Sequence, residues 1–581
     1  MTDAIQSPQQ ELAQRFQQAV AKAFGPEHAG MDPLVRRSDR ADLQANLAMS
    51  LGKALKKPPR EVAQALLSAL DAADLCEKLE IAGPGFINVT LKNEYLNGLL
   101  TRTLGDERLG VPTSPEPQTV VVDYASPNVA KEMHVGHLRP CVIGDCLVRV
   151  LAFAGHRVIR QNHIGDWGTP FGMLIEHLLD LGGADQASEL SLGELDAFYK
   201  AARKKFDSDE TFAERARQRV VSLQGGDEPT LGLWRVLVEA STQNFQKIFA
   251  RLGVTMQPQD TRGESFYNVF LPEIAHDLQS RGIAQVQEGA LCVFPPGFKN
   301  REGEPLPVIV RKSDGGFGYA ATDLAALRFR AQELRGDRLL YVVGSPQAQH
   351  FAMVFAAARL AGYVGEHVRT EHVGFGSVLG QDRKMMKTRS GDTLRLLELL
   401  DEGKERALAE LNERADLPAE DRVALAVSLS LAAIKYTDLS SDRIKDYVFD
   451  WDRMLAAEGN TGPYLQYAQA RQCSMLRKLE PGEVIDPAAI RIQHDREHTL
   501  ALLLLGFGAA VTDVEASLEP HKLCSYLYEL ASAFSSFYQE CPVLKAGTAE
   551  SRASRVALTE LTRRVLVQGM QLLGIDAPAR M

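Results

Sequence analysis

Pro127-Asn-Val-Ala-Lys-Glu-Met-His-Val-Gly-His137 is the stretch that decides the fold of this 581-residue chain. An apolar run at 119–122 precedes it, and the residues after it, 138–153, have the apolar spacing of a helix. A tight turn between a strand and a helix start presents backbone N–H groups, which bind anions. Gly136 has no Cβ, so the backbone can approach a ligand closely. The stretch therefore predicts a nucleotide-binding turn.

β-rich runs alternate with helical segments from residue 118 onward. The runs lie at 120–124, 157–162, 339–343 and 368–373. This alternation predicts an α/β fold with a Rossmann-like parallel sheet covered by helices on both faces. Ligands of such sheets bind beyond the carboxyl ends of the strands, where His134 and His137 follow the first run.

The rest of the chain predicts two further domains. Residues 1–112 combine helical periodicity, including a helix at about 43–55, with an alternating strand at 86–91, and predict an N-terminal α+β domain. A proline-rich linker precedes a catalytic domain at 118–400, which a charged helical insertion interrupts at about 180–260. Long periodic segments predict an all-α domain at 401–581.

Composition is that of an ordinary globular protein, with 45% hydrophobic and 24% charged residues and a net charge of −10. No apolar run approaches the length of a bilayer span, so we expect no membrane partner. The polar N-terminus lacks a signal-peptide pattern, and we expect a cytoplasmic protein. Seven scattered cysteines without a C-x-x-C pair are typical of reduced core thiols, and predict neither zinc nor disulfides.

A second loop, residues 374–391, carries glycines and a cluster of cations. Gly374 and Gly376 begin it, and Arg383, Lys384, Lys387 and Arg389 follow. Glycines allow such a loop to close over a ligand, and its cations suit the charge of a pyrophosphate in a transition state.

Together these motifs resemble those of class I aminoacyl-tRNA synthetases. The pattern P-N-x-x-K-x-x-H-x-G-H resembles their "HIGH" signature in the form typical of the arginyl-tRNA synthetase family, and residues 374–391 resemble their "KMSKS" loop. Segments 161–174, 318–324 and 458–468 also resemble that family. So do 42–46, 59–61 and 82–88 near the N-terminus and 526–531 and 537–544 near the C-terminus, and the likeness therefore covers nearly the whole chain. It implies ATP contacts by Pro127, Asn128, His134, Gly136, His137, Gly374 and Gly376, and catalytic roles for His134, His137, Lys131, Lys384 and Lys387.

The loop aligns with the family pattern in two ways. When the pattern is aligned on the first lysine of the loop, Met386 occupies the position where serine is usual. When it is aligned on the Thr-Arg-x-Gly ending, Lys387 occupies that position. The two alignments leave open which lysine meets the phosphates. The resemblance implies that Lys131, inside the signature, compensates for the departure.

The expected amino-acid site has the chemistry that a guanidinium needs. Tyr319 and Asp323 are four residues apart and share a face if that segment is helical. A carboxylate beside an aromatic ring gives a guanidinium a charge-assisted hydrogen-bond partner and a stacking surface. The resemblance implies further contacts to arginine, which are made by Asp123, Asn128, Glu264 and Gln347.

The resemblance also implies the reaction and its partners. L-arginine is activated with ATP and Mg²⁺, and is then transferred to the 2′-OH of the terminal adenosine of tRNA(Arg) by a monomeric enzyme. The N-terminal domain is implied to contact the tRNA elbow. Tyr464, Tyr467 and Arg471 of the helical domain are expected to stack on anticodon bases.

Two other interpretations stay open at this point. One is a class I synthetase for another amino acid, such as glutamine or cysteine, and a zinc-binding cysteine set would favour cysteine. The other is a non-catalytic tRNA-binding relative, which loss of the signature histidines would mark; both His134 and His137 are present.

Overall fold

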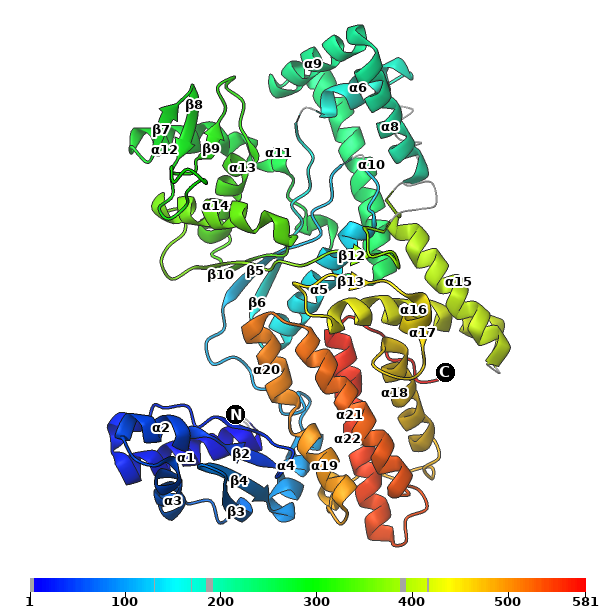
Figure 1. The fold of residues 1–581 in the computed structure, drawn as a ribbon. Helices are drawn as coiled ribbons and strands as arrows, with labels where there is room; N and C mark the ends of the chain where they lie inside the picture. The colour runs from blue at the N-terminus through cyan, green and yellow to red at the C-terminus, as the bar shows by residue number, and fades with distance from the viewer. Residues whose placement is uncertain (1–4, 130, 169, 184–191, 387–392, 415–416) are drawn as a thin grey trace.

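A four-stranded parallel sheet lies at the centre of the protein (Figure 1). The structure is a computed structural model that describes residues 5–129, 131–168, 170–183, 192–386, 393–414 and 417–581. The strands follow the order β11-β10-β5-β6, with bounds β5 (Thr119–Asp123), β6 (Arg157–Gln161), β10 (Arg338–Tyr341) and β11 (Arg369–His372). The predicted parallel sheet is confirmed.

Alternate residues of β5 enter two different hydrophobic cores. Val120 and Val122 pack with α5 (Leu138–Phe153), whereas Val121 packs with α13 (Tyr319–Arg328) and α14 (Ala348–Leu360) on the opposite face. Successive side chains of a strand point to opposite faces, and helices cover both faces here. That arrangement explains why the strand reads as a continuous apolar run.

The N-terminal domain combines an antiparallel sheet with four helices. Its strands have the order β1-β2-β4-β3, and its elements are α1 (Pro8–Phe24), β1 (Val35–Arg37), β2 (Leu43–Ala45), α2 (Leu47–Leu55), α3 (Pro59–Ala69), β3 (Cys76–Ala82), β4 (Phe86–Leu91) and α4 (Asn93–Gly105). The expected helix at 43–55 is wrong in its first residues. Leu43 and Ala45 pair with Val89 and Ile87 of β4, and this long-range pairing overrides local helical spacing.

A helical arm projects from the catalytic core, away from the N-terminal domain (Figure 1). Its helices are α6 (Pro170–Asp180), α8 (Leu192–Ser208), α9 (Glu210–Gln224) and α10 (Glu228–Leu252). Beside α13 lies a small antiparallel sheet that the sequence analysis did not predict, with α11 (Glu264–Tyr267), α12 (Leu271–Ser280), β7 (Ala284–Gln287), β8 (Ala290–Val293) and β9 (Val308–Arg311). Its strands have only four residues each, too few to give a clear period.

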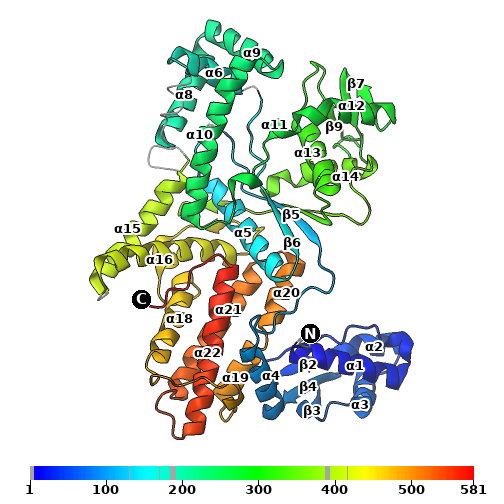
Figure 2. The same ribbon diagram turned by 180° about the vertical axis from the view of Figure 1, so that it is seen from behind.

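The C-terminal part is a helical bundle, which the N-terminal domain contacts at one end (Figure 2). Its elements are α15 (Leu396–Arg414), α16 (Ala419–Ser440), α17 (Trp451–Leu455), α18 (Gly462–Leu476), α19 (Asp495–Leu504), α20 (Phe507–Ser517), α21 (His521–Glu540) and α22 (Ala549–Leu572); two short strands, β12 (Val378–Leu379) and β13 (Tyr447–Val448), join it to the core. The fold class, with three parts of these types, is confirmed; the domain limits at 112, 118, 400 and 401 stay predictions.

Within the part of the chain that the structure describes, two segments are long and apolar enough, by length and composition alone, to cross a bilayer. They are α16 (Ala419–Ser440) and Asp495–Ser517, so the expectation that no apolar run approaches that length is wrong. Of their apolar windows, 56% and 44% are buried inside the protein. A core helix passes the same test, and the two segments are weak grounds for a membrane span.

Candidate active site

The signature turn holds its two histidines through their inner ring nitrogens. Val135–His137 forms one turn of 3-10 helix that leads into α5. The Nδ1 atom of His134 accepts a hydrogen bond from the backbone N–H of Gly136 over 3.1 Å, and the Nδ1 atom of His137 accepts one from the N–H of His134 over 3.1 Å. A neutral imidazole that accepts at Nδ1 carries its proton on Nε2. Both rings, with centroids 4.2 Å apart, can therefore donate from Nε2.

Electrostatics keeps these rings uncharged. Burial lowers the pKa of His134, and the positive charge of Lys131 lowers it further. Burial, with the neighbouring His134, lowers the pKa of His137 to about 3. At neutral pH the turn thus offers hydrogen-bond donors to an anion, and His137 is not an imidazolium.

The chain that follows the second basic loop is joined to this turn. The backbone N–H of Val135 donates to the carbonyl of Leu394 over 2.9 Å, and the N–H of Leu396 donates to the carbonyl of Met133 over 2.9 Å. Arg395 Nε lies 2.6 Å from Glu132 Oε2 in an ion pair. The fold therefore brings residues 394–396, which follow the loop, directly to the signature, although the two segments are far apart in sequence.

Two of the predicted lysines, Lys131 and Lys384, lie at the surface. Lys131 is exposed, and its Nζ lies 4.9 Å from the ring centroid of Tyr199 on α8 of the arm. Lys384 is exposed in a tight turn whose backbone carbonyl accepts from the N–H of Gly380 over 2.8 Å. Lys387 lies outside the described residues, so the choice between the two loop lysines stays open.

Gly374 and Gly376 have a packing role in addition to the predicted contact with ATP. A Cβ atom on Gly376 would lie 2.6 Å from the backbone carbon of Lys445, and one on Gly374 would lie 3.2 Å from Ser345 Oγ. The N–H of Gly376 donates to the carbonyl of Arg443 over 2.9 Å. Gly376 therefore allows close approach between the loop and the segment before β13, and Gly374 allows close approach to Ser345.

Asp123 at the end of β5 is already paired within the protein. Its Oδ2 lies 2.8 Å from Nη1 of Arg330, and its Oδ1 accepts from Ser126 Oγ over 3.2 Å. Arg330 is buried, with its guanidinium 4.9 Å from the ring centroid of Tyr341. Sequence reasoning missed Arg330, because an arginine next to an apolar helix usually lies at the surface.

A single backbone segment, residues 164–165, lies between Glu264 and the signature segment. Its N–H donates to the carbonyl of Ile164 over 3.1 Å, and the N–H of Val129 donates to the carbonyl of Gly165 over 3.0 Å. Residues 164–165 thus separate Glu264 from Asn128, whose side chain is exposed. Burial, together with the negative charges of Asp166 and Asp323, raises the pKa of Glu264 to about 7.

Asp323 projects from α13 and pairs with His350 on α14. Nε2 of His350 lies 2.6 Å from Oδ2 of Asp323. The segment that carries Tyr319 and Asp323 is helical, which places the two on one face; Tyr319 is 78% exposed. Gln347 is exposed in the 3-10 turn before α14. After burial and Asp166, the negative charge of Asp323 also contributes to the raised pKa of Glu264, so the two carboxylates lie within electrostatic range of each other.

The residues expected to bind tRNA differ in exposure. On α18, Tyr467 and Arg471 are exposed, and the guanidinium of Arg471 lies 5.1 Å from the ring centroid of Tyr467 and 5.7 Å from that of Tyr538 on α21. Tyr464 is half-buried, with its ring 5.7 Å from that of Tyr528. Tyr467 and Arg471 therefore form a surface cluster with Tyr538, whereas Tyr464 packs against a neighbouring helix.

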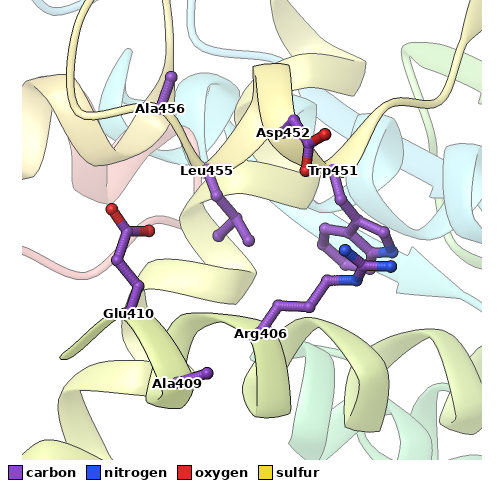
Figure 3. Close-up of a pocket in the computed structure, with 7 residues that line it drawn as sticks. All are labelled: Arg406, Ala409, Glu410, Trp451, Asp452, Leu455 and Ala456. Atoms are coloured by element: carbon purple, nitrogen blue, oxygen red, sulfur yellow. The ribbon is translucent and has the colours of Figure 1, made fainter. Parts of the chain in front are cut away.

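A separate pocket of about 420 Å³ lies between α15 and α17 (Figure 3). Arg406 extends from α15 toward Trp451, and the lining residues are Arg406, Ala409, Glu410, Trp451, Asp452, Leu455 and Ala456. This lining contains no residue of the signature turn or the carboxylate site. The pocket is thus distinct from the candidate active site.

Comparison with protein families decides between the interpretations of the sequence. Residues 99–451 match the family described as tRNA synthetases class I (R), catalytic domain. The chain belongs to the arginyl-tRNA synthetase family. Residues 10–91 match the arginyl tRNA synthetase N terminal domain, and residues 465–581 match the DALR anticodon binding domain. The resemblance that the motifs indicated is confirmed, and membership of the glutamine or cysteine families is excluded.

Other members of the arginyl-tRNA synthetase family match this chain over almost its full length. An arginine–tRNA ligase of Thermobifida fusca is 52% identical over 99% of this chain and 100% of its own, and one of Escherichia coli is 48% identical over 98% and 99%. The crystal structure of arginyl-tRNA synthetase from Plasmodium falciparum matches with a TM-score of 0.86 at 29% identity, covering both chains fully. The Thermus thermophilus enzyme matches with a TM-score of 0.83 at 26% identity, over 99% of this chain and 100% of its own.

Proposed function

We propose that the protein ligates L-arginine to tRNA(Arg), through an arginyl-adenylate formed from ATP. Full-length relatives that carry the name arginine–tRNA ligase support this function. The observation that carries the choice of substrate is the pair of carboxylates, Glu264 and Asp323: burial raises the pKa of Glu264 to about 7, and the negative charges of Asp166 and Asp323 add to that effect. Two negative groups in a partly buried site favour a cationic side chain, and a guanidinium can satisfy both.

In this proposal the signature turn stabilises the phosphates. The arginine carboxylate attacks the α-phosphate in line, and pyrophosphate leaves. His134 and His137 donate from Nε2 to phosphate oxygens, and the dry surroundings of His137 strengthen such hydrogen bonds. Lys131 and Lys384, both exposed, add positive charge to the phosphates, as does Lys387. Positioning and charge stabilisation account for catalysis, because the protein forms no covalent bond to the substrate.

Magnesium fits this scheme as an ion carried by ATP. Mg²⁺ is usually held by substrate phosphates and water with one or two carboxylates, and it supplies charge neutralisation to the triphosphate. Among the described residues, no group of three or more His, Cys, Asp or Glu side chains could hold a metal. A phosphate-held ion needs no such group.

Arginine recognition in this proposal uses Asp323, Glu264, Tyr319 and Gln347, with Asn128 at the α-amino end. Asp123, whose two oxygens bond Arg330 and Ser126, acts at the border of that site. For the tRNA we propose contacts by Tyr467 and Arg471, and a weaker one by half-buried Tyr464. We further propose a monomeric, cytoplasmic enzyme without zinc.

Pyrophosphate exchange tests the function directly. The wild-type protein is assayed with each of the twenty amino acids, with and without tRNA(Arg), and charging of tRNA(Arg) is followed in parallel. We expect exchange and charging with arginine alone. Exchange with glutamine but not arginine would refute the substrate, and tRNA binding without any exchange would indicate a non-catalytic relative.

A further inference from the structure

We propose that His350 is a positioning residue for arginine recognition: its imidazole holds one oxygen of the Asp323 carboxylate and turns the other toward the substrate guanidinium. The inference rests on the proposed function and adds a residue to that site. It concerns the orientation of Asp323, since His350 itself is not expected to touch the reacting atoms.

The geometry of the pair supports this role. Nε2 of His350 lies 2.6 Å from Oδ2 of Asp323, which is short for a hydrogen bond between these groups. Across the described ranges of the chain, His350 is the side chain that pairs with Asp323, and Oδ1 has no hydrogen-bond partner of its own. One carboxylate oxygen is therefore engaged, and the second is available to a ligand.

The imidazole is itself held in place. His350 lies in the first turn of α14, and its ring meets the ring of Phe351 edge-on with centroids 5.4 Å apart. Phe351 in turn stacks on His372 at the end of β11, over 5.3 Å with an interplanar angle of 17°. His372 Nε2 lies 2.8 Å from the carbonyl oxygen of Val343, just after β10. A chain of ring contacts thus links His350 to the ends of two strands of the central sheet.

The position of the pair fits a ligand site. Both side chains are partly accessible, at 33% for His350 and 18% for Asp323, so a substrate can reach the free oxygen. His350 follows Gln347 by three residues, and residues at this spacing lie on neighbouring positions of a helix surface. Gln347 and His350 therefore lie at neighbouring positions at the start of α14.

A fixed carboxylate plane matters for a guanidinium. Recognition of a planar fork depends on the orientation of the carboxylate, and an isolated Asp side chain rotates freely about its last torsion. The imidazole donates from Nε2 in its neutral and its charged form, so it holds Asp323 across the working pH range. Its hydrogen bond to Asp323 raises the pKa of His350, against the effect of burial.

Three variants of His350 test the proposal through steady-state kinetics of arginine charging. In His350→Gln the side-chain amide nitrogen can reach the position of Nε2, whereas in His350→Asn it stands at the position of Nδ1 and falls short. We expect His350→Ala and His350→Asn to raise KM for arginine by about 10- to 100-fold, the loss expected for a hydrogen bond to a charged group. Their kcat and KM for ATP should stay within about twofold of wild type, and His350→Gln should restore most of the arginine affinity.

A double variant sharpens the result. In an Asp323→Asn background, His350→Ala should cause little further loss, because residues that act through one contact are not additive. Full additivity would overturn the proposal, as would an unchanged KM for arginine in His350→Ala or an equal rescue by Asn and Gln. If His350→Ala is unfolded by circular dichroism, the comparison of Gln with Asn still decides. Arginine charging by the wild type tests the proposed function separately, so a normal His350→Ala enzyme would refute only this inference.

Discussion

The Nδ1 atom of His137 lies 3.1 Å from the backbone nitrogen of His134 and accepts its hydrogen bond. The Nδ1 atom of His134 also accepts a backbone hydrogen bond, from the N–H of Gly136 two residues later. Each ring therefore closes the turn with its inner nitrogen and leaves its outer nitrogen as a donor. In each ring Nδ1 stabilises the turn and Nε2 is available to a ligand, and substitutions can separate these two roles.

His137→Asn separates the two roles of this ring. The asparagine oxygen can replace Nδ1 as acceptor for the N–H of His134, but no donor remains at the position of Nε2. We expect kcat for pyrophosphate exchange to fall by about 10²–10³-fold, the range for losing one transition-state donor, while the free energy of unfolding changes by less than about 1 kcal/mol. Exchange kinetics and urea denaturation measure the two effects. A large loss of stability in His137→Asn, equal to that of His137→Ala, would show that the ring is structural only.

Arginine binding should depend on the ionisation of Glu264. Its pKa is raised to about 7 in the unliganded protein, and a guanidinium prefers the ionised carboxylate. The dissociation constant for arginine should therefore be constant above about pH 8 and rise as pH falls, reaching about tenfold at pH 6. Calorimetric titration between pH 5.5 and 8.5 checks the profile. Glu264→Gln should bind arginine weakly with a flat profile, and a wild-type curve without a bend near pH 7 would contradict the assignment.

The raised pKa of Glu264 should also lower the free energy of unfolding at high pH. A carboxyl whose pKa is raised from 4.5 to about 7 binds its proton more tightly when folded, so stability falls as pH rises between these values and stays lower above them. Glu264→Gln removes this cost. Allowing for solvent screening of a partly exposed group, we expect the variant to be more stable by about 1–2 kcal/mol at pH 8 and equal to wild type below about pH 4.5. Denaturation at the two pH values measures the difference; equal stability at pH 8 would argue against a raised pKa.

A buried ion pair joins the catalytic core to the helical bundle. Arg139 on α5 lies 3.4 Å from Asp438 on α16, with side chains 1% and 0% exposed, and Tyr447 donates to the same carboxylate over 3.2 Å. Arg139→Met should lower stability by about 3–5 kcal/mol, because it leaves a buried carboxylate without its cation. The urea midpoint measures the loss. Asp438→Asn in the Arg139→Met background removes the unpaired charge and should recover part of it; no recovery would mean that lost packing, not charge, is responsible.

The sequence alone determined the strand, the turn and the helix that carry the signature. A strand buried on both faces needs a continuous apolar run, which residues 119–122 supply, and Gly136 with flanking histidines defines the turn by local chemistry. The limits of strand β4, Phe86–Leu91, were also predicted from the sequence, because alternation along one strand is a local signal.

Only the tertiary structure decided which side chains meet. Asp123 pairs with Arg330, Asp323 with His350, and Glu132 with Arg395, and each pairing depends on how helices pack over the sheet. Periodicity specifies that a helix has an apolar face but not which partner that face meets, so these contacts left no mark in the sequence pattern. The short strands β2 and β7–β9 were missed for the same reason, because distant pairing partners stabilise them and their own residues carry little signal.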